Sequence, residues 1–239
     1  MKNKLMLVLT PILLLLLSVV AYLKFVNVET DSSKFKKEYE FFNGKDTSYG
    51  EKYLNIKVRS DNPIKYSNYD EVIDVIENKT GIIYLGFPEC PWCRNAIPVL
   101  LDAAKQNKVK TIYYLNILND RDSYVVEDGS LVYEKDDKGK ELKGTTGYKK
   151  LLKVLDNYLT DYTIRYEDEL YETGEKRIYA PSVIFVKDGR VLGIHVSTVD
   201  SQTDPYKSLT DEENDELYSI YEGYINKLYS NSCKVGSSC

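Results

Sequence analysis

The apolar positions along the chain follow three kinds of pattern, and each kind predicts a different element. Residues 5–23 read LMLVLTPILLLLLSVVAYL, an almost continuous apolar run that is long enough to span a bilayer as a helix. Residues 82–87, IIYLGF, form the short apolar run typical of a buried strand. Residues 94–107 and 145–162 place apolar side chains at helical spacing, which predicts two amphipathic helices.

The N-terminal run predicts a single-pass membrane anchor over residues 1–24. Lys2 and Lys4 precede the run, which favours a cytoplasmic N-terminus and places the rest of the chain outside the cytoplasm. A cleaved secretory signal is the alternative. Such signals have a shorter apolar region and end in a small-residue cleavage site, which AYLKFVNVE does not offer. We therefore expect a membrane-tethered protein, with a secreted protein as the alternative.

The anchor is expected to connect to a folded domain over residues 51–230 through a tether over residues 25–50. A short helix inside the tether is predicted to begin with Asp31 or Ser32 as its cap. Residues 53–58, YLNIKV, alternate between apolar and polar side chains, which predicts the first strand of the domain.

The central part of the chain alternates between helical and strand patterns. A helix is predicted to end at Gly81, and it is followed by the buried strand 82–87, the helix 94–107 and a second strand at residues 111–117. Two strands joined through a helix predict a βαβ unit with parallel strands. The fold class is therefore α/β.

Two cysteines, Cys90 and Cys93, lie between the buried strand and the helix that follows it, in the stretch GFPECPWCRNAIPVL. A helix N-terminus carries unpaired backbone N–H groups and about half a positive elementary charge, which favour an anion. Such positions lower the pKa of a cysteine thiol into the range ~3.5–7.5. Pro91 suits the first helical position, where an N–H has no partner. We expect Cys90 to be the nucleophile and Cys93 to resolve the mixed disulfide.

Composition narrows the functional classes. The chain has 239 residues, a net charge of −5 and 43% hydrophobic residues, as expected for one substantial folded domain with extensions. Because phosphate binding needs a basic surface, nucleic acid is not an expected partner. His195 is the one histidine and is expected to be a structural strand residue. The spacing of the four cysteines does not match a zinc site, so no metal and no cofactor are expected.

Three stretches give residues 68–229 a resemblance to the thioredoxin-fold thiol–disulfide oxidoreductases. The first is the CPWC motif at residues 90–93, which follows a buried strand, and the second is Pro98 in the helix after it. The third is YAPSVIFVKDGRVLGIHV, residues 179–196, which resembles the family's segment of cis-proline, strand, tight turn and strand.

The resemblance implies a thioredoxin-like fold, with a central mixed sheet flanked by helices and an α/β insertion before the cis-proline strand. It also implies that Cys90 and Cys93 are the catalytic pair and that Pro181 is the cis-proline beside them. Substrate contacts are implied at four positions: Pro181, Ala180, Trp92 and Pro91. More narrowly, GFPECPWC, KRIYAPSVIFVKDG and SQTDPYKSLTDEE resemble Gram-positive extracytoplasmic proteins grouped with bacteriocin transport accessory proteins.

Two positions depart from the family's pattern. Many thioredoxins place a buried Asp six residues before the first cysteine, where this chain has Tyr84. A tyrosine cannot perform the same proton transfer at neutral pH. Glu89 directly precedes Cys90, and its negative charge is expected to oppose the helix N-terminus by raising the thiol pKa.

Residues 118–178 are expected to form the insertion. A hairpin is predicted around the Asp-Gly turn at residues 128–129, and Thr145 or Thr146 is predicted to cap the helix at 145–162. The insertion either completes the core as a lid or binds substrate near the cysteines.

The C-terminal part of the chain is predicted to be a helix that begins at Thr210, followed by a flexible tail over residues 231–239. The tail contains Cys233 and Cys239. These two cysteines form a second, local disulfide, remain inconsequential thiols, or exchange with the first pair.

Two functional hypotheses follow. The first is thiol–disulfide exchange on protein substrates outside the cytoplasm, with a membrane redox partner that recycles the cysteine pair. The alternative is an export-accessory or chaperone-like module that binds peptides with little net redox turnover. A glutathione-using enzyme of the glutaredoxin type is less favoured, because VIFVKDGRVLG lacks the glycine pair expected after its cis-proline strand.

Overall fold

The computed structural model describes residues 11–19 and 29–230. A helix with exposed side chains spans residues 11–19, and among the described residues none of the helices has the length and apolar character needed to cross a bilayer. The rest of the predicted anchor lies outside the described residues, as do Cys233 and Cys239.

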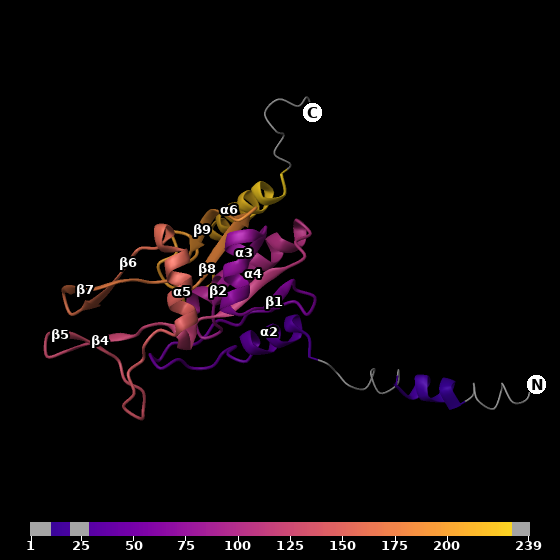
Figure 1. Cartoon of the computed structure of the whole chain (residues 1–239). Helices are drawn as coiled ribbons and strands as arrows, with labels where there is room; N and C mark the ends of the chain where they lie inside the picture. The colour runs from indigo at the N-terminus through magenta and orange to yellow at the C-terminus, as the bar shows by residue number, and fades with distance from the viewer. Residues whose placement is uncertain (1–10, 20–28, 231–239) are drawn as a thin grey trace, which may run out of the picture.

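A five-stranded mixed sheet forms the centre of the domain, with the strand order β1-β3-β2-β8-β9 (Figure 1). The first three strands in this order run parallel, whereas β8 and β9 are antiparallel to their neighbours. The strands are β1 (Ile64–Tyr66), β2 (Gly81–Gly86), β3 (Ile112–Asn116), β8 (Ser182–Lys187) and β9 (Arg190–Val196). Every residue of β2 is buried, as its continuous apolar sequence predicts.

Helices cover both faces of the sheet. Alternate strand residues point to opposite faces. Gly81 lies against Val75 of α3, and Tyr84 reaches Tyr39 of α2 on the other face. Helices α4 and α6 pack against each other, and α3 packs against α5. The helices are α2 (Asp31–Glu40), α3 (Tyr69–Asn78), α4 (Pro91–Gln106), α5 (Thr146–Val154) and α6 (Asp211–Tyr229). The predicted central mixed sheet flanked by helices is confirmed.

The short helix predicted within residues 25–50 is present as α2, but it belongs to the core and not to a tether. Phe35 and Tyr39, one helical turn apart, are both fully buried. The Phe35 ring centroid lies 4.3 Å from that of Tyr39 and 4.9 Å from that of Tyr114 in β3. The remaining side chains of α2 are mostly charged, which explains why the helix resembles a solvated linker in sequence.

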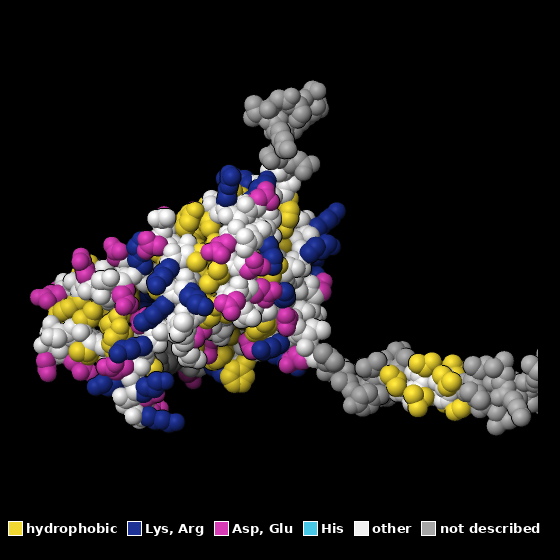
Figure 2. Space-filling view, in the orientation of Figure 1, with side chains coloured by type: hydrophobic (Ala, Val, Ile, Leu, Met, Phe, Trp, Pro, Cys, Tyr) yellow, Lys and Arg dark blue, Asp and Glu magenta, His cyan; other side chains and the backbone are white. Residues whose placement is uncertain are grey.

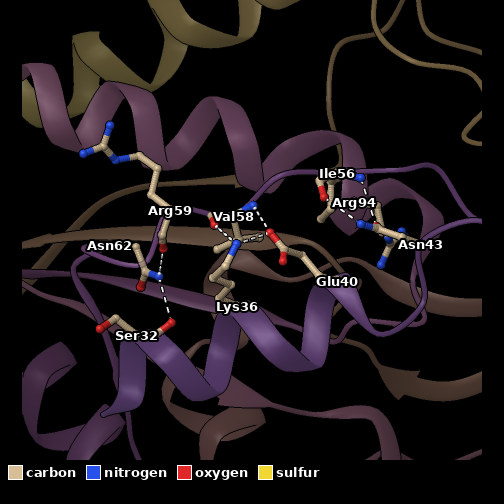
Figure 3. Close-up of polar contacts among 9 residues, drawn as sticks. All are labelled: Ser32, Lys36, Glu40, Asn43, Ile56, Val58, Arg59, Asn62 and Arg94. Atoms are coloured by element: carbon tan, nitrogen blue, oxygen red, sulfur yellow. Dashed lines mark hydrogen bonds and ion pairs between the residues drawn. The ribbon is translucent and has the colours of Figure 1, made fainter. Parts of the chain in front are cut away.

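Residues 53–58 do not form the predicted strand, because side chains of α2 and the turn after it satisfy their backbone groups (Figure 3). The Asn43 side chain accepts from the Ile56 N–H at 3.0 Å and donates to the Ile56 carbonyl at 2.9 Å. A Glu40 carboxylate oxygen accepts from the Val58 N–H at 2.9 Å. This extended segment therefore lies along α2 without a strand partner.

Threonine side chains cap the N-termini of α2 and α5. Thr30 caps α2, with its Oγ1 accepting from the Ser33 N–H at 3.2 Å, so the predicted caps Asp31 and Ser32 are one and two residues too late. Thr145 caps α5, which confirms one of the two predicted residues.

The insertion between β3 and β8 contains two hairpins and α5, and both hairpins project from the same side of the domain (Figure 1). Asp128 and Gly129 have φ of 50° and 73°, which confirms the predicted turn. The helix predicted over 145–162 ends at Val154. The remaining elements are two 3-10 turns (Leu118–Asp120 and Asp156–Tyr158), β4 (Tyr124–Glu127), β5 (Ser130–Tyr133), β6 (Asp161–Tyr166) and β7 (Glu169–Lys176).

Acidic and basic side chains are interspersed over the face of the domain in Figure 2. Apolar side chains lie between them over the projecting hairpins. Tyr166 and Leu170, at the turn of the β6–β7 hairpin, are both exposed.

Replacing Phe35 with Ala is expected to lower the free energy of unfolding by about 3–5 kcal/mol, because it removes a fully buried ring from the core. Phe41→Ala is the matched control, since this ring is 63% exposed, and it is expected to cost less than about 0.5 kcal/mol. Urea denaturation of the full chain in mild detergent measures both values. Equal, small losses in the two variants would show that α2 is a tether.

Candidate active site

The connection between β2 and α4 positions the two cysteines. Strand β2 ends at Gly86, and α4 begins at Pro91 with Cys90 as its cap. Cys90 has extended backbone angles, and its Sγ accepts a hydrogen bond from the Cys93 N–H at 3.2 Å. The Cys90 sulfur therefore occupies the place that a capping oxygen takes in other helices. The predicted location of Cys90 at the helix N-terminus is confirmed.

Both thiols are free, but they differ in their surroundings. The side chain of Cys90 is 5% exposed and that of Cys93 is fully buried. Burial raises the pKa of the Cys93 thiol, and the hydrogen bond and charge of Cys90 raise it further. In this arrangement Cys90 is the outer sulfur, which can react with a substrate, and Cys93 is the inner sulfur, which can react only with Cys90.

The loop before β8 closes over Cys90. The Ala180–Pro181 peptide bond is cis, as the resemblance implies for Pro181. The Cys90 thiol donates to the Ala180 carbonyl at 3.3 Å. Pro181 is buried, whereas Trp92, between the two cysteines, is half-buried and packs against the core. The structure thus brings the predicted substrate-contact residues Ala180 and Pro181 to the cysteine that caps α4.

Glu89 lies beside a pocket, in the loop between β2 and α4. The pocket has a volume of about 420 Å³ and is lined in part by Phe41, Phe42, Pro88 and Glu89. One carboxylate oxygen of Glu89, Oε2, is buried and has no hydrogen-bond partner among the described residues. The residue directly before Cys90 therefore lines a hollow of mixed character, to which Lys37, Glu38 and Asn116 also contribute.

Arg94 follows Cys93 and is fully buried (Figure 3). Its guanidinium donates to the carbonyls of Tyr39, Leu54 and Pro88 at 2.7, 2.6 and 3.2 Å, and also to the Asn43 side chain. Burial lowers the pKa of Arg94. Because Pro88 lies two residues before Cys90, this one side chain fixes both the loop before the cysteines and the segment after α2. No signal in the sequence distinguishes this arginine from a surface one.

The insertion brings a second arginine close to the cysteines. The Arg121 guanidinium carbon lies 4.8 Å from the Phe87 ring centroid. Burial lowers the pKa of Arg121, and the neighbouring Arg177 lowers it further, whereas Cys90 and Cys93 raise it. Its Nε is buried without a hydrogen-bond partner among the described residues. The sequence interpretation did not include this residue, because no local pattern connects it to the cysteines.

A row of aromatic rings joins the hairpins to the cis-proline loop. The ring centroids of Tyr124 and Tyr162 are 5.9 Å apart, and those of Tyr162 and Tyr179 are 6.4 Å apart. The Arg177 guanidinium lies over Tyr162 at 4.1 Å from its centroid. Because Tyr179 directly precedes Ala180, the insertion packs against the loop that contacts Cys90.

His195 lies in β9, where its Nε2 is 2.8 Å from the Thr198 carbonyl. Burial lowers the pKa of this imidazole. Within residues 11–19 and 29–230, no cluster of three or more His, Cys, Asp or Glu side chains has an arrangement that could hold a metal ion.

The site therefore joins Cys90, Cys93, Ala180 and Pro181 from two separate parts of the sheet. Comparisons of the chain with protein-family models, curated proteins and solved structures find no match. Function must then be inferred from the geometry of these residues.

Replacing Arg94 with Met is expected to lower the free energy of unfolding by about 3 kcal/mol or more, because several buried carbonyl oxygens lose their donor. Arg59→Met is the matched control, since Arg59 makes a surface ion pair with Asp61 that is worth less than about 1 kcal/mol. Urea denaturation of both variants distinguishes them. Losses of the same size would contradict the structural role of Arg94.

Alkylation by iodoacetamide at neutral pH is expected to modify Cys90 about a hundredfold faster than Cys93, because Cys93 is buried and its pKa is raised. The rates are measured by mass spectrometry on Cys90→Ser and Cys93→Ser chains that also carry Cys233→Ala and Cys239→Ala. Faster modification of Cys93 would reverse the assignment of the outer and inner sulfur.

Proposed function

We propose that this chain is a thiol–disulfide oxidoreductase that acts on protein substrates. One observation carries the proposal: the Cys90 sulfur lies 3.2 Å from the Cys93 nitrogen and 3.3 Å from the Ala180 oxygen. The sulfur is thus held by a helix N-terminus on one side and faces an exchange partner and a backbone acceptor on the other. A structural disulfide needs the second cysteine, but it needs neither the helix-terminal position nor the backbone acceptor.

The finer fold assignment, a thioredoxin-like domain, belongs to the same proposal. The cysteines follow β2, a parallel strand at the centre of the sheet, and the cis-proline precedes β8, its antiparallel neighbour. Pro98 lies inside α4, as the resemblance requires. These features support the fold that the CPWC motif suggests.

The reaction is a pair of sulfur exchanges. The Cys90 thiolate attacks one sulfur of a substrate disulfide, a Cys90–substrate bond forms, and the other substrate sulfur leaves as a thiolate. Cys93 then attacks Cys90, loses its proton to the solvent and releases the second substrate thiolate. The pair is oxidised and the substrate is reduced by two electrons. The reverse sequence oxidises the substrate, and the potential of a membrane redox partner decides the direction.

The proposed location is the outer side of a cell membrane. The apolar run at residues 5–23 and the preceding Lys2 and Lys4 support a single-pass anchor with the domain outside the cytoplasm. Disulfide chemistry on secreted chains takes place in such compartments. A role similar to that of bacteriocin transport accessory proteins is the narrower form of this proposal.

A second candidate function is peptide binding with little redox turnover. The pocket lined by Phe41, Phe42, Pro88 and Glu89 favours it, because an exposed aromatic ring beside a hollow suits an apolar side chain of an extended peptide. In this form the cysteines serve only to stabilise the loop.

The two functions are separated with a short peptide whose single cysteine is disulfide-bonded to 5-thio-2-nitrobenzoate. The full chain with Cys233→Ala and Cys239→Ala is expected to release the peptide and form a Cys90–Cys93 disulfide. With Cys93→Ser added, the peptide is expected to remain attached to Cys90, because the resolving thiol is absent. Non-reducing mass spectrometry measures each product.

The Cys90→Ser variant is expected to form neither product. Exchange at an undiminished rate in this variant would refute the oxidoreductase. If the parent chain and the Cys90→Ser variant bind the same peptide equally well and the parent shows no exchange, the protein is a peptide-binding module instead.

A further inference from the structure

A cluster of buried tyrosines lies next to the inner cysteine. Tyr84 comes from β2, Tyr39 from α2 and Tyr114 from β3, and all three side chains are fully buried. The hydroxyl oxygens of Tyr39 and Tyr84 are 2.7 Å apart, which is a hydrogen bond. The rings of Tyr84 and Tyr114 stack with centroids 5.5 Å apart. Tyrosine hydroxyls in an apolar core need a partner, and this pair provides one to each other.

The Tyr84 hydroxyl also lies near the sulfur of Cys93. A Cβ atom at Gly86 would lie 2.5 Å from the Tyr84 hydroxyl oxygen and 3.0 Å from Cys93 Sγ. Both atoms therefore crowd the same point beside the Gly86 backbone, where only glycine leaves room for them. The two atoms are therefore neighbours, and donation from the Tyr84 hydroxyl lowers the Cys93 pKa against the larger, raising effect of burial.

Either hydroxyl of the Tyr39–Tyr84 pair can be the donor, and one of the two arrangements leaves a proton for Cys93. Burial raises the pKa of Tyr39 and of Tyr84 well above the ordinary value, so both hydroxyls keep their protons at neutral pH. Each hydroxyl has one proton to donate. If Tyr39 donates to the Tyr84 oxygen, the Tyr84 proton is free to point at Cys93. Hydrogen bonds in such a chain polarise one another in a low-dielectric core.

We propose that Tyr84, held by Tyr39, is a positioning residue for the second exchange: its hydroxyl donates to the Cys93 sulfur and stabilises the thiolate that attacks Cys90. The proposal rests on the proposed function, because it assigns Cys93 to the resolving step. Tyr84 occupies the position where many thioredoxins have a buried Asp that transfers a proton. The structure gives it a different role, in which the tyrosine keeps its proton throughout.

The step balances without another reactant. The Cys93 thiol loses its proton to the solvent, and the thiolate attacks the Cys90 sulfur of a mixed disulfide. The Cys90–Cys93 bond forms, the bond from Cys90 to the substrate sulfur breaks, and the substrate leaves as a thiolate. A thiolate forms in a fully buried place, where a charge without a donor is costly. A donor from Tyr84 offsets part of that cost.

Other titratable groups around Cys93 come from several different elements. They are Cys90, Tyr39, Tyr114, Arg121 and Tyr221. Within the described residues, the hydroxyls of Tyr114 and Tyr221 have no geometric hydrogen-bond partner. Tyr221 therefore offers a matched control: it is a buried tyrosine of α6 whose hydroxyl can be removed without breaking a hydrogen bond.

The test follows the reaction of the reduced full chain with 5,5′-dithiobis(2-nitrobenzoate) by stopped flow, in mild detergent and with Cys233→Ala and Cys239→Ala. Attack by Cys90 releases one thionitrobenzoate at a rate proportional to reagent concentration. Resolution by Cys93 releases the second at a rate independent of it. The two phases report separately on the outer and the inner sulfur.

Tyr84→Phe is expected to slow the second phase about tenfold at neutral pH. The midpoint of the pH dependence of this phase is expected to move about one pH unit higher. At a pH where Cys93 is fully ionised, the variant and the parent are expected to have the same rate. The first phase is expected to stay within about twofold. Tyr39→Phe is expected to slow the second phase less, because Tyr84 keeps its own hydroxyl. The double variant is expected to match Tyr84→Phe, and Tyr221→Phe to match the parent.

A second phase that Tyr84→Phe leaves unchanged, or slows equally at every pH, overturns the role of Tyr84 alone. If Tyr39→Phe slows the second phase further when the Tyr84 hydroxyl is already absent, Tyr39 does not act through Tyr84, and the proposed order of hydrogen bonds is wrong. The absence of any reagent-independent phase in the parent refutes the proposed oxidoreductase instead. If circular dichroism shows that Tyr84→Phe is unfolded, Tyr39→Phe decides the question, and an unchanged second phase in it overturns the proposal.

Discussion

The candidate site is built around one hydrogen bond, from the Cys93 N–H to the Cys90 sulfur at the start of α4. A strand buried on both faces must leave the sheet through a short loop, and the helix that follows has N–H groups to satisfy. Using a sulfur as the cap places a soft, ionisable atom where the helix favours negative charge. It also fixes the second thiol one turn behind the first, where it is buried in the core.

The rest of the site keeps that cap in place. Arg94 fastens the loop before Cys90 to the segment after α2, and the cis-proline loop supplies the Ala180 carbonyl. Helix α2 closes one face of the sheet with Phe35, and it also places the Tyr39 hydroxyl against that of Tyr84. A segment that precedes the cysteines by about fifty residues thus shapes the environment of the inner thiol.

The local parts of this arrangement could be predicted from sequence. The buried strand, the cap position of Cys90 and the turn at Asp128–Gly129 all follow from short-range patterns, whereas the cis bond at Pro181 was implied only by the family resemblance. The errors arose where tertiary contacts decide. Helix α2 is mostly charged and has only two buried rings, so its sequence does not indicate that it is part of the core. Residues 53–58 alternate like a strand, but side chains rather than a neighbouring strand bind their backbone groups. Leu155 and Leu159 continue the apolar spacing of α5 beyond its end at Val154. The buried Arg94 and the nearby Arg121 could not be predicted, because their partners are far away in the sequence.

The reduction potential of the Cys90–Cys93 pair distinguishes a redox-active pair from a structural one. The full chain, with Cys233→Ala and Cys239→Ala, is equilibrated with glutathione buffers, and the fraction of disulfide is measured by mass spectrometry. The account predicts one two-electron couple that disappears with Cys90→Ser. A potential near about −270 mV would make the protein a reductant, and one near about −120 mV a disulfide donor. Failure of the pair to form a disulfide at any buffer ratio would contradict the account and leave the cysteines a structural role only.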